Sequence, residues 1–207
     1  MIPAIVLAAG KSSRMGRPKA TLPLDERETF LTRIVRTFKE ASVEDVVVVV
    51  GHRAEEIIAS FADVDVAARF VENPDYEQGQ LSSLIAGLQV VDRPGVVAAL
   101  VTLVDVPLVS AATVRAVVDR YRQTRASVVR PVRGAEHGHP VLIDRSLFDA
   151  IRHADPAVGA KQLIRANVSL EGDVNVDDDG AFTDADTLDD YRRLRASLQG
   201  RHRNASS

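Results

Sequence analysis

Short, valine-rich apolar runs constrain the fold of this chain more than any other feature. "DVVVVVG" (residues 45–51) is apolar at every position between its ends, which is typical of a strand buried on both faces of a sheet. Similar runs at residues 5–8, 67–71 and 96–104 alternate with stretches whose apolar residues recur at helical spacing. Those predicted helices lie at residues 30–41, 54–61, 80–91 and 113–122. The alternation predicts an α/β fold, a doubly wound and mostly parallel sheet with helices on both faces.

The pattern loosens after residue 127, where we expect a small antiparallel part. Further strands are predicted at residues 127–132, 140–143, 168–170 and 173–176, and further helices at 146–153, 159–166 and 188–198. The acid-rich segment 173–180 is predicted to form a hairpin turn. We therefore expect one domain over residues 1–198, with halves at 1–126 and 127–198, and a flexible tail at 199–207.

Charge and cysteine content exclude several classes of function. With 26 basic and 29 acidic residues the net charge is −3, whereas proteins that bind nucleic acid or membranes in general carry a basic excess. There is no cysteine, which rules out disulfides, thiolate metal sites and cysteine nucleophiles. No apolar run is long enough to span a bilayer. We expect a cytoplasmic protein that binds neither nucleic acid nor membranes.

The loop after the first predicted strand concentrates positive charge in a small-residue segment. "LAAGKSSRMGRPKATLP" (residues 7–23) contains Gly10, Gly16, Arg14 and Lys19. Backbone N–H groups of such a turn, together with basic side chains, can bind a phosphate. The spacing of the glycines does not fit the Walker loop, and the chain contains no G-x-G of the dinucleotide fingerprint. The segment predicts a phosphate site of another kind, and NAD binding is poorly supported.

Acidic residues are predicted at the same end of the sheet. Asp105 follows the fourth strand, and ligands of doubly wound sheets bind at the carboxyl ends of strands. "TDADT" (residues 183–187) supplies a second carboxylate, Asp184 or Asp186. Mg²⁺ is usually held by one or two carboxylates together with phosphate oxygens and waters, so Mg²⁺ is the expected cofactor if the bound phosphate belongs to a nucleotide.

The loop motif resembles the signature of the sugar-nucleotide-type nucleotidyltransferases, and within them the chain is most similar to the MobA-like molybdenum-cofactor cytidylyltransferase branch. The resemblance extends to segments that follow in the order and spacing of that branch: "ENPDYEQGQLSSLIAGL" (72–88), "LVDVPLVS" (103–110), "GHPVLI" (138–143), "DPAVGAKQLI" (155–164) and "FTDADTLDDYRRL" (182–194). It covers nearly all of the chain up to residue 194. It implies a Rossmann-like fold of the nucleotide-diphospho-sugar transferase type, with the acceptor bound by the second half.

The resemblance also implies an activity and its residues. It implies CMP transfer from CTP to the phosphate of molybdopterin, with pyrophosphate released, and a molybdenum hydroxylase apoenzyme as a possible partner. Lys19, Arg14 and Asp105 would be catalytic, and Asp105 and Asp184 would hold Mg²⁺, the family pattern favouring Asp184 over Asp186. From the residues alone, His139 either orients part of the acceptor or packs before Pro140. The nucleotide-binding residues implied are Leu7, Ala8, Ala9, Gly10, Gly16, Lys19, Gly79 and Ser82. An alanine pair before Gly10, where guanylyl-transferring relatives usually have glycines, favours cytidine.

Two alternatives of other classes stay open. One is an NAD(P)-dependent oxidoreductase acting on a small aromatic substrate, which the absence of G-x-G disfavours. The other is a non-catalytic molybdenum-cofactor chaperone, which would not need Lys19, Asp105 and Asp184 intact.

Overall fold

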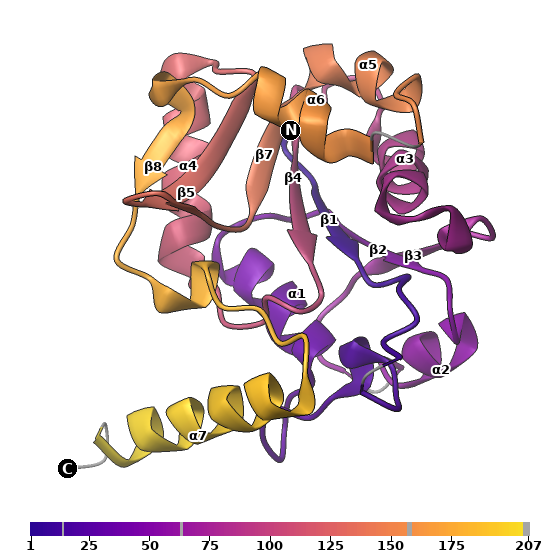
Figure 1. Cartoon of the computed structure of the whole chain (residues 1–207), viewed down its shortest axis with the longest axis vertical. Coiled ribbons are helices and arrows are strands. Elements are labelled where there is room, and N and C mark those ends of the chain that lie inside the picture. The colour runs from indigo at the N-terminus through magenta and orange to yellow at the C-terminus, as the bar shows by residue number, and fades with distance from the viewer. Residues whose placement is uncertain (14, 63, 157–158, 205–207) are drawn as a thin grey trace.

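A mixed sheet forms the centre of the protein (Figure 1). In the computed structural model, residues 1–13, 15–62, 64–156 and 159–204 are described, the last six of them by their backbone alone. These residues form eight strands, in the order β3-β2-β1-β4-β7-β5-β6, with β8 paired to β5. The strands are β1 (Ala4–Leu7), β2 (Val46–Val50), β3 (Arg69–Glu72), β4 (Ala98–Leu103), β5 (Val128–Arg133), β6 (Glu136–His137), β7 (Val141–Asp144) and β8 (Asp173–Asn175).

The first four strands are parallel, as the apolar runs predict. The chain passes from β1 to β2 and β3 toward one edge, then crosses back so that β4 lies on the other side of β1. At this reversal Leu7 and Leu103 are paired at the carboxyl ends of β1 and β4. Such a switch point is where doubly wound sheets bind ligands.

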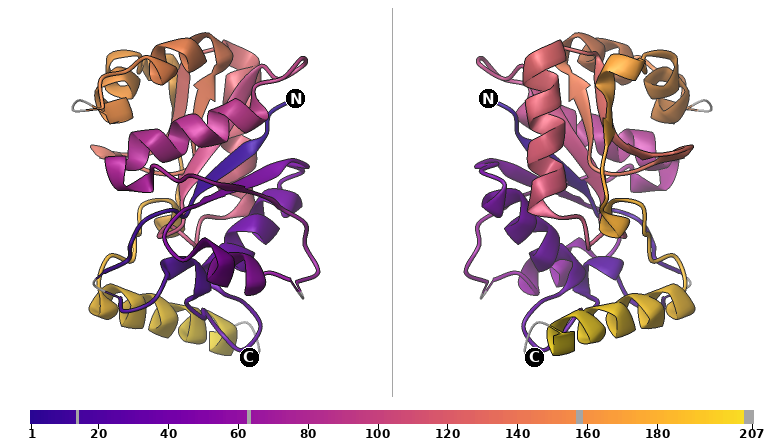
Figure 2. Two further views of the ribbon diagram at one scale, coloured as in Figure 1. Left: turned by 90° about the vertical axis from the view of Figure 1, so that its right-hand side faces the viewer. Right: turned by 90° about the vertical axis from the view of Figure 1, so that its left-hand side faces the viewer.

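Helices cover both faces of the sheet (Figure 2). Alternate residues of one strand enter different cores because side chains of a strand point to opposite faces. Ala4 and Val6 pack with α1 (Phe30–Glu40) and α4 (Ala111–Thr124). Ile5 and Leu7 pack with α3 (Gln80–Val91), α5 (Phe148–Arg152) and α6 (Gly159–Ala166). The predicted α/β architecture is confirmed.

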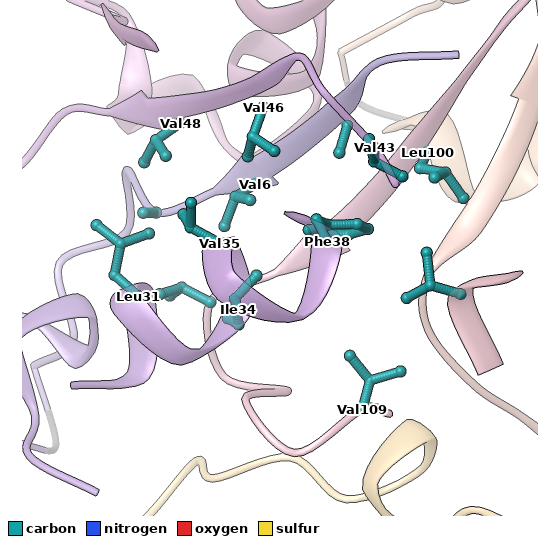
Figure 3. Packing of buried hydrophobic residues seen from close by; sticks show 14 of the residues in the cluster. Val6, Leu31, Ile34, Val35, Phe38, Val43, Val46, Val48, Leu100 and Val109 are labelled. Atoms are coloured by element: carbon teal, nitrogen blue, oxygen red, sulfur yellow. The ribbon is translucent and has the colours of Figure 1, made fainter. Parts of the chain in front are cut away.

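Helix α1 shows how the periodic pattern becomes packing. Thr29 begins the helix with a reciprocal capping arrangement with Thr32. Figure 3 shows apolar side chains of α1 beside apolar side chains of the neighbouring strands, with Leu31, Ile34, Val35 and Phe38 from the helix and Val6, Val46 and Val48 from the sheet. The short α2 (Ala54–Ala59) adds Ile57 to the same core.

The second half is antiparallel where it joins the sheet, since β7 pairs antiparallel with both β4 and β5. The predicted strand at residues 168–170 is wrong, because this segment leads into a 3-10 turn at Leu170–Gly172. Leu170 is 90% exposed, so this apolar residue is not part of the core. The predicted hairpin turn at 173–180 is also wrong, because β8 pairs parallel with β5. Asp178 instead accepts hydrogen bonds from Ser110 N and Thr113 Oγ1 at the start of α4.

The last helix, α7 (Leu188–Asn204), lies beside the end of the loop at residues 8–23, which is called the phosphate loop after its predicted role. Tyr191 donates a hydrogen bond to the Pro23 carbonyl at 2.7 Å, and its ring centroid lies 5.8 Å from that of Phe30. The helix continues past residue 198, where it was predicted to end, so part of the predicted tail is helical. None of the helices in the described ranges is long and apolar enough to cross a membrane.

Candidate active site

A cavity of about 380 Å³ lies at the carboxyl ends of β1 and β4. The nucleotide-site and catalytic residues predicted from sequence that line it are Leu7, Ala9, Gly10, Lys19, Gly79 and Asp105. It is also lined by Ser12, Ser13, Met15, Tyr76, Gln80, Ser83, Leu103, Val104 and Asp186. The reversal in the sheet and the basic loop therefore meet at one cavity, as the sequence predicts.

The phosphate loop folds around Ser12. Its carbonyl accepts a hydrogen bond from Met15 N at 2.9 Å, and its Oγ accepts one from Lys19 N at 3.1 Å. Gly16 has a φ of +69°, a conformation that side chains with a Cβ rarely adopt. These contacts turn the chain so that Lys19 re-enters the cavity. Arg14 lies outside the described residues.

Lys19 is the charge centre of the cavity. Its Nζ donates to Asp105 Oδ2 at 3.0 Å and to Asp186 Oδ1 at 2.7 Å, and its side chain is only 11% exposed. Burial alone lowers the pKa of the Lys19 ammonium, but the hydrogen bonds and charges of Asp186 and Asp105 outweigh burial and raise the pKa above its usual value. The Lys19 side chain is therefore positively charged at neutral pH and is fixed in place by Asp105 and Asp186.

Three carboxylates gather near this lysine. Asp105 Oδ1 is buried and has no hydrogen-bond partner among the described residues, although most buried polar atoms have one. The Ala185 N–H donates to the Asp105 carbonyl at 2.9 Å, which fixes the segment carrying Asp184 and Asp186 against the end of β4. Burial and the charges of Asp186 and Asp105 raise the pKa of Asp184. The crowded negative charge and the unpartnered oxygen are features that a bound cation would relieve.

The structure separates the two candidate second metal ligands. Asp186 lines the cavity and contacts Lys19, whereas Asp184 lines a neighbouring cavity of about 360 Å³. Within the described ranges no three His, Asp or Glu side chains form a group that could hold a metal. Mg²⁺ is usually bound by one or two carboxylates together with substrate phosphates and water, so an Mg²⁺ site does not require such a group.

His139 lies close to the carboxylates but lines neither of these two cavities. Burial lowers the pKa of its imidazole, opposed by a hydrogen bond to the Val101 backbone and by the charges of Asp105 and Asp184. Its Nδ1 is buried with no partner in the described part of the chain, and its backbone N–H donates to the Ala181 carbonyl at 2.8 Å. A contact of His139 with an acceptor stays a prediction.

The start of α3 forms the wall opposite the phosphate loop. Gly79, with a φ of +100°, turns the chain into the helix. Ser82 is not among the lining residues, because its hydroxyl faces back to the Asp75 and Gly79 carbonyls, 2.9 Å away in each case. Ser83 lines the cavity instead. Gln80 and Ser83 are three residues apart and share a face of α3, but only the rotation of the helix in the fold turns that face toward the cavity.

Ala8 and Gly16 are likewise not among the lining residues. The Ala8 methyl packs in the core on the α1 side of the sheet, and Gly16 shapes the loop. Tyr76 does line the cavity, although the sequence analysis did not select it. Its side chain lies against Gly51, where a Cβ would come within 2.6 Å of the tyrosine Cβ. At the rim Lys11 and Glu77 form an ion pair of 2.6 Å.

This geometry defines an α/β protein with a cavity at the sheet reversal, in which a lysine is paired with two carboxylates. The chain belongs to the MobA-like NTP transferase family, whose model matches residues 4–172. The predicted family and its nucleotidyltransferase class are thus confirmed.

Named relatives differ in what they do. The chain is 31% identical over 197 residues to a nicotine blue oxidoreductase of Paenarthrobacter nicotinovorans, covering 92% of this chain and 94% of the relative. It is 27% identical over 194 residues to the molybdenum cofactor cytidylyltransferase of Escherichia coli strain K12, covering 92% and 93%.

A solved structure resembles the whole fold. The crystal structure of Rv0371C of Mycobacterium tuberculosis H37Rv in complex with manganese has a TM-score of 0.72 and 28% identity, covering 95% of this chain and 98% of that one. That neighbour was thus solved with a divalent metal.

Proposed function

We propose that this protein transfers CMP from CTP to the terminal phosphate of molybdopterin. An oxygen of the acceptor phosphate attacks the α-phosphorus of CTP, the bond from that phosphorus to the bridging oxygen breaks, and pyrophosphate leaves. A phosphate nucleophile is ionised at neutral pH, so the step needs no general base. Such transfer depends mainly on positioning and on electrostatic stabilisation.

The observation that carries this proposal is the buried Lys19 ammonium at the reversal of the sheet. In the proposed complex Lys19 contacts the α-phosphate, where negative charge accumulates in the transition state. Arg14, in the same loop, is proposed to contact the β- and γ-phosphates. Gly10 adds a small residue, exposed at the rim, that leaves room for the phosphates.

Asp105 and Asp184 are proposed to hold Mg²⁺. Asp105 offers an oxygen without a partner, and Asp184 lies among like charges, whereas Asp186 is already paired with Lys19. A bound Mg²⁺ would neutralise negative charge on the substrate phosphates. The neighbour of 28% identity that was solved in complex with manganese supports metal dependence for this chain.

Selection of cytidine is proposed to depend on how well the base fits the cavity. The Ala9 methyl lines the cavity together with Leu7 and Gly79, so the slot is narrow on the loop side. A pyrimidine suits such a slot, whereas a larger purine meets the methyl group. The E. coli relative named as a cytidylyltransferase agrees with this proposal.

Oxidoreductase chemistry is the second candidate, and one observation favours it. The relative named nicotine blue oxidoreductase shares 31% identity over nearly the full length of both chains. The absence of G-x-G counts against a typical dinucleotide site in this chain.

A product analysis tests both candidates. The protein is incubated with Mg²⁺, molybdopterin and each nucleoside triphosphate in turn. The pterin products are then separated, and their masses are determined by mass spectrometry. Cytidylyl transfer predicts a pterin cytosine dinucleotide from CTP and little product from GTP. Consumption of NADH or NADPH with a small aromatic acceptor, without any dinucleotide product, would favour the oxidoreductase.

A further inference from the structure

Asn73 is a buried polar residue that directly follows β3 and contacts the start of α3. Its side chain is buried, with the residue 3% exposed. The backbone N–H of Asn73 donates to the Val50 carbonyl at 2.8 Å, and the Asn73 Oδ1 accepts from Asp75 N at 3.0 Å. These two bonds hold the turn after β3.

The side-chain amide nitrogen of Asn73 faces two serines of α3, on the side opposite the amide oxygen. Asn73 Nδ2 donates to Ser82 Oγ at 2.9 Å and to Ser83 Oγ at 3.0 Å. The Asp75 N–H can only donate, so it fixes which end of the Asn73 amide is the oxygen. Both serine oxygens must therefore accept, and each serine keeps one O–H to donate elsewhere.

The hydroxyl protons of Ser82 and Ser83 differ in the acceptors that they can reach. Ser82 faces the Asp75 and Gly79 carbonyls, which can take its proton. Ser83 has no acceptor among the described residues, and it lines the nucleotide cavity. The Ser83 O–H is thus left to donate into the cavity.

We infer that Asn73 is a positioning residue that fixes Ser83 as a hydrogen-bond donor to the base of a bound nucleotide. The partner atom would be an acceptor on the base edge, a carbonyl oxygen or an unprotonated ring nitrogen. The inference rests on the proposed function in so far as the ligand is a nucleoside triphosphate. Asn73 touches no substrate and acts through Ser83.

Asn73→Asp separates this role from support of the fold. An aspartate keeps the oxygen that accepts from Asp75 N; at pH 8 its ionised form, which the Asp75 N–H and the two serine hydroxyls stabilise, can only accept. The serines would then donate to the introduced carboxylate, and Ser83 would turn a lone pair instead of a proton toward the base. A residue that merely supports the turn would lower the melting temperature without changing affinity.

The experiment measures CTP binding with Mg²⁺ by calorimetry at pH 8, well below the melting temperature of each variant. Asn73→Asp and Ser83→Ala are each expected to weaken binding about 3- to 10-fold, the effect of one neutral hydrogen bond. The double variant is expected to bind no more weakly than the weaker of the two single variants, because both changes remove the same donor. Asp75→Ala is the control in the same turn, since among the described residues its exposed carboxylate accepts a hydrogen bond from Gln78 alone.

Each outcome decides the inference. Wild-type affinity in Asn73→Asp, or losses that multiply in the double variant, would overturn it. Should Asn73→Asp fail to fold by circular dichroism, Asn73→Ala is measured in its place against the same Ser83→Ala cycle. If the wild-type protein binds none of the four triphosphates, the proposed function fails, which is distinct from wild-type binding that Asn73 does not affect.

Discussion

Lys19 Nζ donates a hydrogen bond to Asp105 Oδ2 at 3.0 Å, although 86 positions in the sequence separate the two residues. This bond joins the loop after β1 to the loop after β4, which are neighbouring strands at the reversal of the sheet. Both side chains are mostly buried, so water screens their interaction only partly. The fold thus holds a cation and a carboxylate at one side of the cavity before any ligand is bound.

Replacing Lys19 with alanine should lower turnover far more than it weakens nucleotide binding. Its charge is proposed to meet negative charge that grows in the transition state, and losing a comparable donor costs about 3–4 kcal/mol, or roughly 100- to 1000-fold in rate. The measurement is kcat and KM for pyrophosphate release. Turnover within a few-fold of the wild type would show that Lys19 has another role.

Asp184→Asn and Asp186→Asn should affect metal binding differently. If Asp184 holds the metal with Asp105, Asp184→Asn weakens Mn²⁺ binding about tenfold or more. Asp186→Asn releases Lys19 but leaves the proposed ligands in place, so its effect on Mn²⁺ affinity should be smaller. Paramagnetic relaxation of water protons during a Mn²⁺ titration reports how much of the ion is bound. The opposite order would assign the metal to Asp186.

CTP should stabilise the protein against heat more than GTP does in the presence of Mg²⁺, because a ligand that binds the folded state raises its apparent stability. Ala9→Gly should narrow this difference, since removing the methyl group removes the clash with a purine. Thermal shifts with all four triphosphates check both points. Equal shifts, or a larger shift with GTP, would contradict cytidine selection while leaving nucleotidyl transfer standing.

Asp92 gives the prediction that depends on pH. It accepts hydrogen bonds from Arg152 at 2.5 Å and from Arg145 at 2.8 Å, joining the end of α3 to the segment after β7. The Arg152 hydrogen bond lowers the pKa of Asp92; burial opposes this, and the bond and charge of Arg145 add to the lowering. A carboxyl whose folded pKa is below its unfolded value stabilises the fold above the unfolded pKa, near 4, and loses this contribution as pH falls through the folded pKa.

Asp92→Asn should therefore lower the free energy of unfolding at pH 7 by at most about 1 kcal/mol, because its partners are partly exposed. The difference from the wild type should shrink as pH is lowered below about 4. Urea denaturation across this range measures it. Asp119→Asn, which removes an exposed pair with Arg122, is the control and should change little at any pH. A deficit that stays constant with pH would mean that packing, not charge, is lost.

The parallel core and the main site were predictable from the sequence for one physical reason. A strand buried on both faces must be apolar throughout, so β2 and β4 are visible as valine-rich runs, and the polar residues that follow them stand at the carboxyl edge. Lys19 and Asp105 were expected near each other on this basis. The glycines of the phosphate loop marked its sharp turns in the same direct way.

What the sequence could not specify depends on how distant segments meet. The position of residues 184–187 follows from the Ala185–Asp105 backbone bond and from Gly180, where a Cβ would lie 1.9 Å from the Leu108 carbonyl. Neither contact leaves a periodic pattern. Likewise, Ser82 and Ser83 are adjacent in sequence, and only the rotation of α3 decides which one lines the cavity. The choice between Asp184 and Asp186 as metal ligand stays a prediction.

The central claim is nucleotidyl transfer, and the release of pyrophosphate tests it most directly. Purified protein is given CTP, Mg²⁺ and molybdopterin, and pyrophosphate is measured over time together with the consumption of the acceptor. We predict one pyrophosphate for each molybdopterin consumed, with almost none when the acceptor is omitted or when Asp105→Asn replaces the wild-type protein. Absence of pyrophosphate with every triphosphate, in a preparation that oxidises NADH or NADPH with a small aromatic substrate, would contradict the account.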